Sequence, residues 1–198
     1  MISENELKRL ARLKQRKQRQ QTRRFLVEGV RLAEEALEAG VVETLLLVSE
    51  PEMSDRVAAL LRAAEKVDVP VKEIDSKSLK RLTDTVAQQG VVAVARMPEN
   101  LELTPSDGNW LFLDQIRDPG NLGTMLRTAD WFGVENVALS PATADPYNPK
   151  VVRAGMGAHF HLRLETEMSL ESFSSSDYTV LAADLDGEPI AHRAVSIS

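Results

Sequence analysis

Three side chains in the middle of the chain have types and spacing that suit chemistry on an anionic substrate. They are Asn121, Gly123 and Arg127, in the pattern N-x-G-x-x-x-R. The same residues also suit structural roles, with Asn121 as a helix N-cap, Gly123 at a packing contact and Arg127 paired with Asp130 at i+3. On an ideal helix Asn121 and Arg127 lie about 120° apart, so they converge only if Asn121 precedes the helix.

The segments around these residues predict a strand, a turn and a helix. Residues 110–114 (WLFLD) form an apolar run with the length of a buried strand. Residues 118–121 (DPGN) have turn chemistry, and apolar residues at helical spacing predict a helix over residues 122–132. In an open α/β sheet such a junction lies at the carboxyl end of a strand, where ligands bind. The free N–H groups at the helix start favour an anion there.

Composition narrows the class of protein. The 198 residues contain no cysteine, which excludes disulfides, thiolate nucleophiles and cysteine–zinc sites. The N-terminus lacks the apolar core of a secretory signal, and no apolar run approaches the length of a membrane span. We therefore expect a cytoplasmic protein without a membrane partner. His159 and His161 alternate on a predicted strand with no third ligand nearby, so we expect no metal site.

Charge is distributed unevenly along the chain. The net charge is −6, yet residues 1–24 hold nine Lys and Arg against two Glu, and the remainder holds 15 basic and 28 acidic side chains. Ser3 followed by Glu6 is a capping-box pattern that predicts a helix over residues 3–20 with three leucines on one face. This helix is either a solvated element docked by its leucines or an arm that tracks RNA or DNA phosphates. The cations expected at the nucleic acid are Arg16, Lys17, Arg19, Arg23 and Arg24.

The order of apolar runs and amphipathic stretches predicts an α/β chain in two parts. Residues 1–96 alternate strands and helices, which favours a mostly parallel sheet. Residues 97–109 are rich in Pro, Gly and Asn and predict a linker to a second domain over residues 110–198. A further buried strand is predicted over residues 178–184 (YTVLAAD), and the chain stops where another strand should begin.

Two long motifs resemble the SpoU family of RNA ribose 2′-O-methyltransferases, within the SPOUT superfamily. They are DPGNLGTMLRTAD (118–130) and NPKVVRAGMGAHF (148–160), in the order that this family has them. The stretches FLVEGVRLAEEAL (25–37) and QQGVVAVA (88–95) resemble the start and end of the family's L30e-like substrate-binding domain. The resemblance implies an L30e-like α/β domain followed by a SPOUT-type parallel-sheet domain.

The resemblance also implies an activity and the residues that carry it. The family transfers a methyl group from S-adenosylmethionine to a ribose 2′-hydroxyl in structured RNA, and rRNA is the substrate expected here. Asn121 and Arg127 occupy the motif positions of the catalytic pair. The residues that would border the RNA are Glu28, Arg31, Lys150 and Arg153.

The later motifs of the family do not occur before Ser198. In the family these segments form a deep trefoil knot and supply most of the cofactor pocket and much of the homodimer interface. We therefore expect the SPOUT-type domain to be incomplete at its C-terminus, with cofactor-binding residues unknown and a homodimer only for a full-length form. Two alternatives stay open: a catalytically inactive RNA-binding protein, and an α/β oxidoreductase that binds a nucleotide at the DPGNLGT turn, which lacks a GxGxxG.

Overall fold

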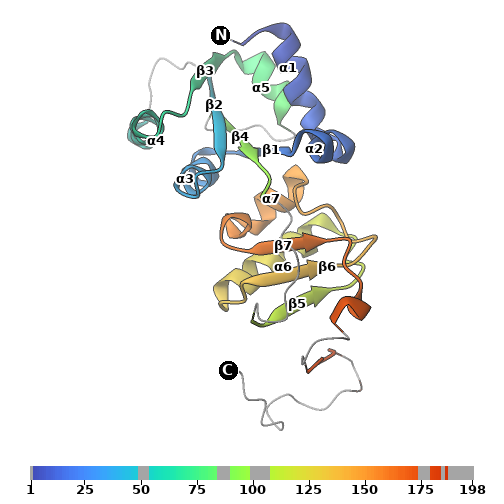
Figure 1. Cartoon of the computed structure of the whole chain (residues 1–198). Helices are drawn as coiled ribbons and strands as arrows, with labels where there is room; N and C mark the ends of the chain where they lie inside the picture. Colours follow the sequence, from blue (N-terminus) through green and yellow to red (C-terminus); the bar gives the residue numbers. More distant parts are fainter. Residues whose placement is uncertain are drawn as a thin grey trace.

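Four strands build the first of two sheets. The computed structural model describes residues 2–48, 54–83, 90–98, 108–173, 179–183 and 186. The sheet has the order β1-β4-β2-β3 (Figure 1). Its strands are β1 (Arg24–Glu28), β2 (Val42–Val48), β3 (Val71–Ile74) and β4 (Val91–Arg96).

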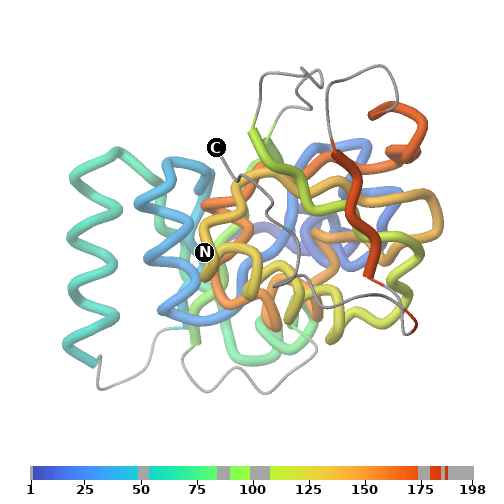
Figure 2. Tube along the Cα trace, turned by 90° about the horizontal axis from the view of Figure 1, so that it is seen from below, coloured from blue at the N-terminus to red at the C-terminus, as the bar shows by residue number. Residues whose placement is uncertain are grey.

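Alternating side chains of this sheet feed a core on each face. On one face Phe25, Leu45 and Ala93 pack with α3 (Val30–Glu38) and α4 (Asp55–Lys66). These two helices lie side by side in Figure 2. On the opposite face the sheet packs with α1 (Glu4–Ala11) and α5 (Ser76–Leu82), through Leu7, Leu10 and Leu13 among others. The alternation of side chains along the strands therefore directs apolar residues to both faces of the sheet, and a layer of helices covers each face.

The direction of these strands differs from the mostly parallel sheet predicted from the sequence. β4 lies between β1 and β2 and runs antiparallel to both, and only β2 and β3 pair in parallel. The apolar run of β4 is buried on both faces, which fits a central strand of either direction. The α/β class is confirmed, but the prediction of parallel pairing is wrong for this sheet.

The basic N-terminal segment forms three short helices. The Oγ of Ser3 accepts a hydrogen bond from the Glu6 amide at 3.2 Å at the start of α1, which confirms the capping prediction. A 3₁₀ turn, η1 (Arg12–Lys14), and α2 (Arg16–Thr22) follow, with Gln15 extended between them. The single helix predicted over residues 3–20 is wrong. On one helix Leu13 and Arg19 would lie about 120° apart, whereas the break allows both side chains to be buried.

The second sheet is parallel. It has the order β5-β6-β7 and contains β5 (Trp110–Leu113), β6 (Asn136–Leu139) and β7 (Arg163–Thr166). One face is covered by α6 (Pro119–Trp131) and α7 (Pro149–Gly155). On the other side, Phe173 of η3 (Leu170–Phe173) meets the rings of Trp110 and Phe112 edge-on, at 5.7 and 6.1 Å between centroids.

α6 and α7 touch through backbone because Gly123 faces α7. A Cβ at this position would lie 2.4 Å from the Ala154 Cβ and 2.8 Å from the Val151 carbonyl oxygen. Gly123 is therefore a packing glycine, one of the two roles that its position predicted. α7 is short because its C-cap, Met156, takes a left-handed conformation that ends the helix after Gly155.

The two sheets are joined by a common core. Phe25 of β1 lies 5.0 Å from the ring of Tyr147, and Tyr147 and Val152 belong to the same buried cluster as β1 and α3. Figure 1 shows α7 directly beneath the first sheet. We call residues 2–98 the first unit, residues 108–173 the second unit, and the contact between them the seam. Most of the linker predicted over residues 97–109 lies outside the described residues, so the domain boundary stays a prediction.

Residues 179–183 correct one expectation. They are neither helical nor extended in a sheet, and Val180 and Leu181 are exposed. The buried strand predicted over residues 178–184 is therefore wrong for this part, and its end residues lie outside the described ones. An apolar run becomes a strand only where a neighbouring strand accepts its hydrogen bonds. Within the described ranges, no helix is long and apolar enough to cross a membrane.

Candidate active site and nucleic-acid interface

Asn121 lies on α6 and not in the turn before it. Asp118 is the N-cap, with its Oδ1 accepting a hydrogen bond from the Asn121 amide at 2.8 Å, and Pro119 occupies the first turn. The prediction that the helix begins at Leu122 is wrong by three residues, because proline is preferred at the first helical position and Asp is a strong N-cap. Asn121 and Arg127 are therefore separated by about 9 Å along the helix axis and do not share a face.

Arg127 is exposed on α6 and lies against the end of α7. Its Nη1 is 3.3 Å from the Met156 Sδ, a weak acceptor. The pairing of Arg127 with Asp130 that helical spacing suggested does not occur, because the Asp130 carboxylate lies 3.2 Å from the Nδ1 of His161. Because Asp130 is engaged by His161, the N–H groups of the Arg127 guanidinium stay available to bind a negatively charged substrate.

Several of the predicted RNA-facing residues gather around α7. The Arg153 Nη1 donates to the Glu28 Oε2 at 3.0 Å, and the Glu28 side chain is only 6% exposed. Arg31, at the start of α3, pairs with Glu35 at 3.3 Å. Lys150 is exposed at the start of α7. Glu28 is therefore a partner of Arg153 at the seam and not an exposed carboxylate.

The Glu35 carboxylate also lies on the backbone of Gly157, just beyond α7. A Cβ at Gly157 would lie 1.5 Å from the Glu35 Oε2, and the backbone there has φ of 101°, which favours glycine. Glycine at this position lets α3 reach the end of α7. The first unit therefore contacts the helix against which Arg127 lies.

Arg19 is a structural residue, which corrects its assignment to RNA. Its side chain is 1% exposed and forms an ion pair with Asp145 of the second unit, to which Nε donates at 3.0 Å. Its Nη1 donates to the carbonyl oxygens of Leu13 and Lys14 at 2.7 and 2.8 Å. All three nitrogens are occupied and desolvated, so no phosphate can reach this guanidinium.

The other cations of the arm divide by their contacts. Arg16 pairs with Glu167 of the second unit at 2.5 Å, and Arg24 pairs with Glu43 at 2.5 Å. Arg23 donates to the Pro98 carbonyl oxygen. Part of the positive charge of residues 1–24, the basic arm, therefore serves to dock this arm on the acidic second unit.

Lys17 remains exposed, together with two cations that the sequence interpretation missed, Arg9 and Arg12. Across the described ranges these three side chains form no ion pair. These three cations differ from the docked ones only because they lie on turns that face solvent. The density of Lys and Arg in the sequence does not show which turns these are.

The two histidines of the predicted strand lie instead in and after a 3₁₀ turn, η2 (Ala158–Phe160). His159 is buried, and its Nε2 lies 2.7 Å from the Pro146 carbonyl oxygen. Burial lowers the pKa of His159 to about 4, so the ring is neutral at pH 7. His161 is exposed, so the two rings do not share an environment.

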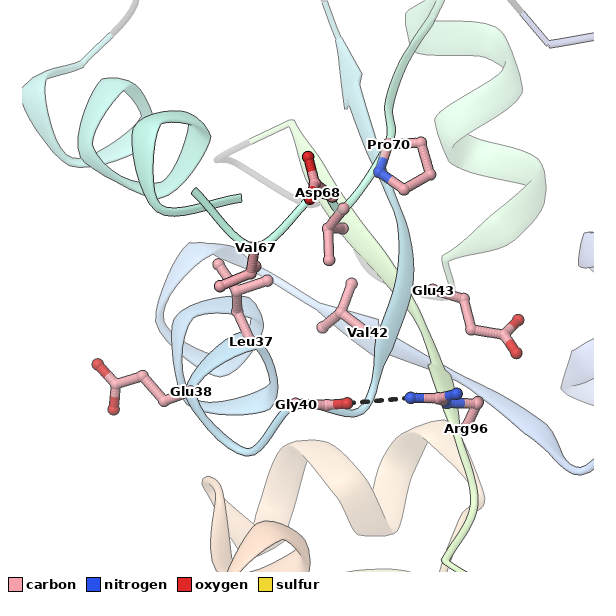
Figure 3. Close-up of a pocket in the computed structure, with 10 residues that line it drawn as sticks. Leu37, Glu38, Gly40, Val42, Glu43, Val67, Asp68, Pro70 and Arg96 are labelled. Carbon is pink, nitrogen blue, oxygen red and sulfur yellow. Dashed lines mark hydrogen bonds between the residues drawn. The ribbon is translucent and has the colours of Figure 1, made fainter. Parts of the chain in front are cut away.

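Two hollows adjoin Arg96. The larger, of about 480 Å³, lies between α3 and the loop before β3, and its wall carries Glu38, Glu43 and Asp68 (Figure 3). These carboxylates disfavour a phosphate. The second, of about 320 Å³, opens at the seam. Neither lies at the carboxyl ends of β5, β6 and β7, where a parallel sheet binds a ligand, so we assign no described residue to a cofactor.

Comparisons with known proteins cover both units. The SpoU rRNA Methylase family matches residues 108–197, and the MRM3-like substrate binding domain matches residues 4–93. The chain is 35% identical over 152 residues to the 23S rRNA (guanosine(2553)-2'-O)-methyltransferase RlmP of Bacillus subtilis, spanning 76% of this chain and 57% of that protein. It is 32% identical over 183 residues to the human mitochondrial rRNA methyltransferase 3, spanning 87% of this chain and 42% of that protein.

Solved structures that superpose on this chain are also named as methyltransferases. The AdoMet-bound rRNA methyltransferase from Sinorhizobium meliloti superposes with a TM-score of 0.73 at 29% identity, over 88% of this chain and 66% of that one. The SpoU methyltransferase AviRb from Streptomyces viridochromogenes, in complex with AdoMet, gives 0.74 at 29% identity over 87% and 66%. The chain thus spans between about two fifths and two thirds of the length of these proteins.

Fold, site and comparisons together define the class: an α/β module of the substrate-binding type joined to a parallel α/β module of the SpoU type. Within that class, the chain belongs to the SpoU rRNA methylase family.

Proposed function

We propose that the protein is an S-adenosylmethionine-dependent methyltransferase that modifies a ribose 2′-hydroxyl of rRNA. The observation that carries this proposal is the exposed Arg127, placed on the family's motif helix and against α7, where the first unit docks. Named rRNA methyltransferases match both units in the same order, which supports an rRNA substrate. An rRNA substrate also favours the compartment where ribosomes assemble, in line with the cytoplasmic location expected from the sequence.

The roles of the site residues follow from their charge and exposure. A guanidinium does not act as a base in proteins, so Arg127 binds a phosphate or orients the ribose hydroxyl instead of removing its proton. That proton then leaves through water or a phosphate oxygen. When bound, S-adenosylmethionine supplies the electrophilic methyl group. Asn121 would hold the RNA backbone near the start of α6, separately from Arg127.

Cations around α7 would hold the RNA beside this arginine. Lys150 and Arg31 are exposed and suit phosphate contacts. Arg153 is 34% exposed and is held by Glu28, which we regard as a positioning residue. The arrangement supports an RNA that lies across both units.

Methyl transfer tests the proposal directly. A form of the protein that also carries the family's later motifs is incubated with labelled S-adenosylmethionine and a 23S rRNA fragment, and the labelled nucleotide is identified by nuclease digestion. We expect label on a ribose 2′-oxygen. RNA binding without transfer to any fragment would instead support the inactive RNA-binding alternative.

The exposed cations of the arm are expected to contribute most of its RNA affinity. Replacing Arg9, Arg12 and Lys17 with Gln should weaken RNA binding and reduce the salt slope of log K by roughly 0.7 to 0.9 per lost phosphate contact. The matched control is Arg16→Gln, which removes a cation already paired with Glu167 and should change the slope less. The measurement is fluorescence anisotropy over a range of salt concentrations. Equal slopes in the triple variant and the wild type would rule out phosphate contacts by this arm.

We also propose a homodimer through the end of α6. Trp131 is 85% exposed and Phe132 is 76% exposed, a large apolar area for a free surface. A second copy of the chain would cover both rings. In a form that also carries the family's later motifs, sedimentation velocity should then give a dimer, and a monomer for Trp131→Ser combined with Phe132→Ser; a monomer without these substitutions would overturn the proposal.

A further inference from the structure

The smaller hollow is built by both units. The first unit contributes Phe25, Val41 and Arg96, and the second contributes the segment from His159 to Glu165. Its volume of about 320 Å³ falls at the lower end of the range of small-molecule sites. We call this hollow the seam groove. It exists only while the two units are docked, so any ligand in it contacts both.

The lining of the seam groove combines apolar and aromatic side chains with the buried Glu165 and the half-buried Arg163 of β7, both of which have partners of their own. Phe25 forms part of its floor, and the half-buried Phe160 ring stacks on Phe25 at 6.5 Å between centroids and 24° between planes. Leu164 of β7 adds an aliphatic wall. A flat ring can therefore lie against Phe160 without burying an unpaired charge of the protein.

The mouth of the seam groove carries arginines from neighbouring strands. Arg96 is exposed and lines the groove, and its Nη2 donates to the Gly40 carbonyl oxygen at 3.1 Å (Figure 3). Arg24 lies directly opposite Arg96 in the β1–β4 register. Arg23 is held at the Pro98 carbonyl, and Pro98 also lines the groove. Arg96 thus lies at the opening, and Arg24 and Arg23 lie on the segments beside it.

This combination matches one ligand chemistry. Proteins recognise RNA sequence mainly at unpaired nucleotides, whose bases stack on aromatic rings or guanidinium planes while cations hold the phosphates. We propose that the seam groove receives one unpaired nucleotide of the RNA, with its base against Phe160 and its phosphate at Arg96. This inference rests on the proposed function, because it adds a subsite to the same RNA. The larger hollow, walled by carboxylates, does not suit the same ligand.

The test compares two RNAs and three variants. The RNAs are a hairpin with an unpaired loop and a blunt duplex of the same stem, and binding is measured by fluorescence anisotropy. Phe160→Leu keeps an apolar side chain but removes the aromatic face, and Arg96→Gln removes an exposed cation without disturbing the core. Arg62→Gln, an exposed cation on α4, is the matched control.

Each outcome decides the proposal. We expect Phe160→Leu and Arg96→Gln to weaken hairpin binding roughly tenfold, with little effect of Phe160→Leu on the duplex, and Arg62→Gln to bind as the wild type does. Hairpin binding unchanged in Phe160→Leu and Arg96→Gln would overturn the subsite and leave RNA binding intact. If Phe160→Leu lost the same affinity for the hairpin and for the duplex, the subsite would also be rejected, because a duplex offers no unpaired base. A wild-type protein that binds neither RNA would overturn the proposed function as well.

Discussion

Replacing Asp145 with alanine is expected to lower the free energy of unfolding by about 3–5 kcal/mol, because it leaves the charge of Arg19 buried and unpaired. Arg19 is 1% exposed, so water cannot replace the lost carboxylate. Asp145 also accepts a hydrogen bond from the Tyr147 amide at 2.9 Å, which adds to the loss. The measurement is urea unfolding at pH 7, followed by circular dichroism.

Matched variants separate burial from charge. Arg81→Gln removes a surface ion pair with Glu4 and should cost less than about 1 kcal/mol. Combining Arg19→Met with Asp145→Leu should recover part of the loss, because no unpaired charge remains, although the carbonyls of Leu13 and Lys14 lose their donor. A cost for Asp145→Ala as small as that of Arg81→Gln would mean that solvent reaches Arg19 at the seam.

In a form that also carries the family's later motifs, replacing Arg127 with alanine should reduce kcat for methyl transfer by about 10²–10³-fold, the usual loss on removing one donor that acts in the transition state. RNA affinity should change little, because the exposed cations of the arm and of α7 remain. Arg127 is exposed, and among the described residues its guanidinium hydrogen-bonds the Met156 Sδ, so the substitution leaves the core intact. Initial rates and RNA binding, measured on the same preparation, separate the two effects.

The control for Arg127 is Arg117→Ala, another exposed arginine, whose guanidinium contacts Gln115 before α6 begins. It should leave kcat nearly unchanged. Arg127→Lys should fall between the wild type and alanine, since lysine keeps the charge but loses the planar fork. Equal losses of affinity and kcat in Arg127→Ala would make Arg127 a binding residue only.

Local signals in the sequence were reliable where a structural feature depends on residues that are neighbours along the chain. Ser3 caps the helix that it was expected to cap, and Gly123 occupies a contact that admits no Cβ. The start of α6 shows the limit of such signals. Asp118 and Asn121 are both good caps, and the proline between them decides for Asp118.

The sequence by itself determined the α/β class, the family, and the motif helix that carries Arg127. Only the tertiary structure decided the direction of β4, the burial of Arg19, and the seam groove. Each of these depends on partners far apart along the chain, such as Asp145, which lies 126 residues from Arg19. Charge density identifies a basic segment, but desolvation by a distant surface selects which of its cations becomes structural and which stays available to RNA.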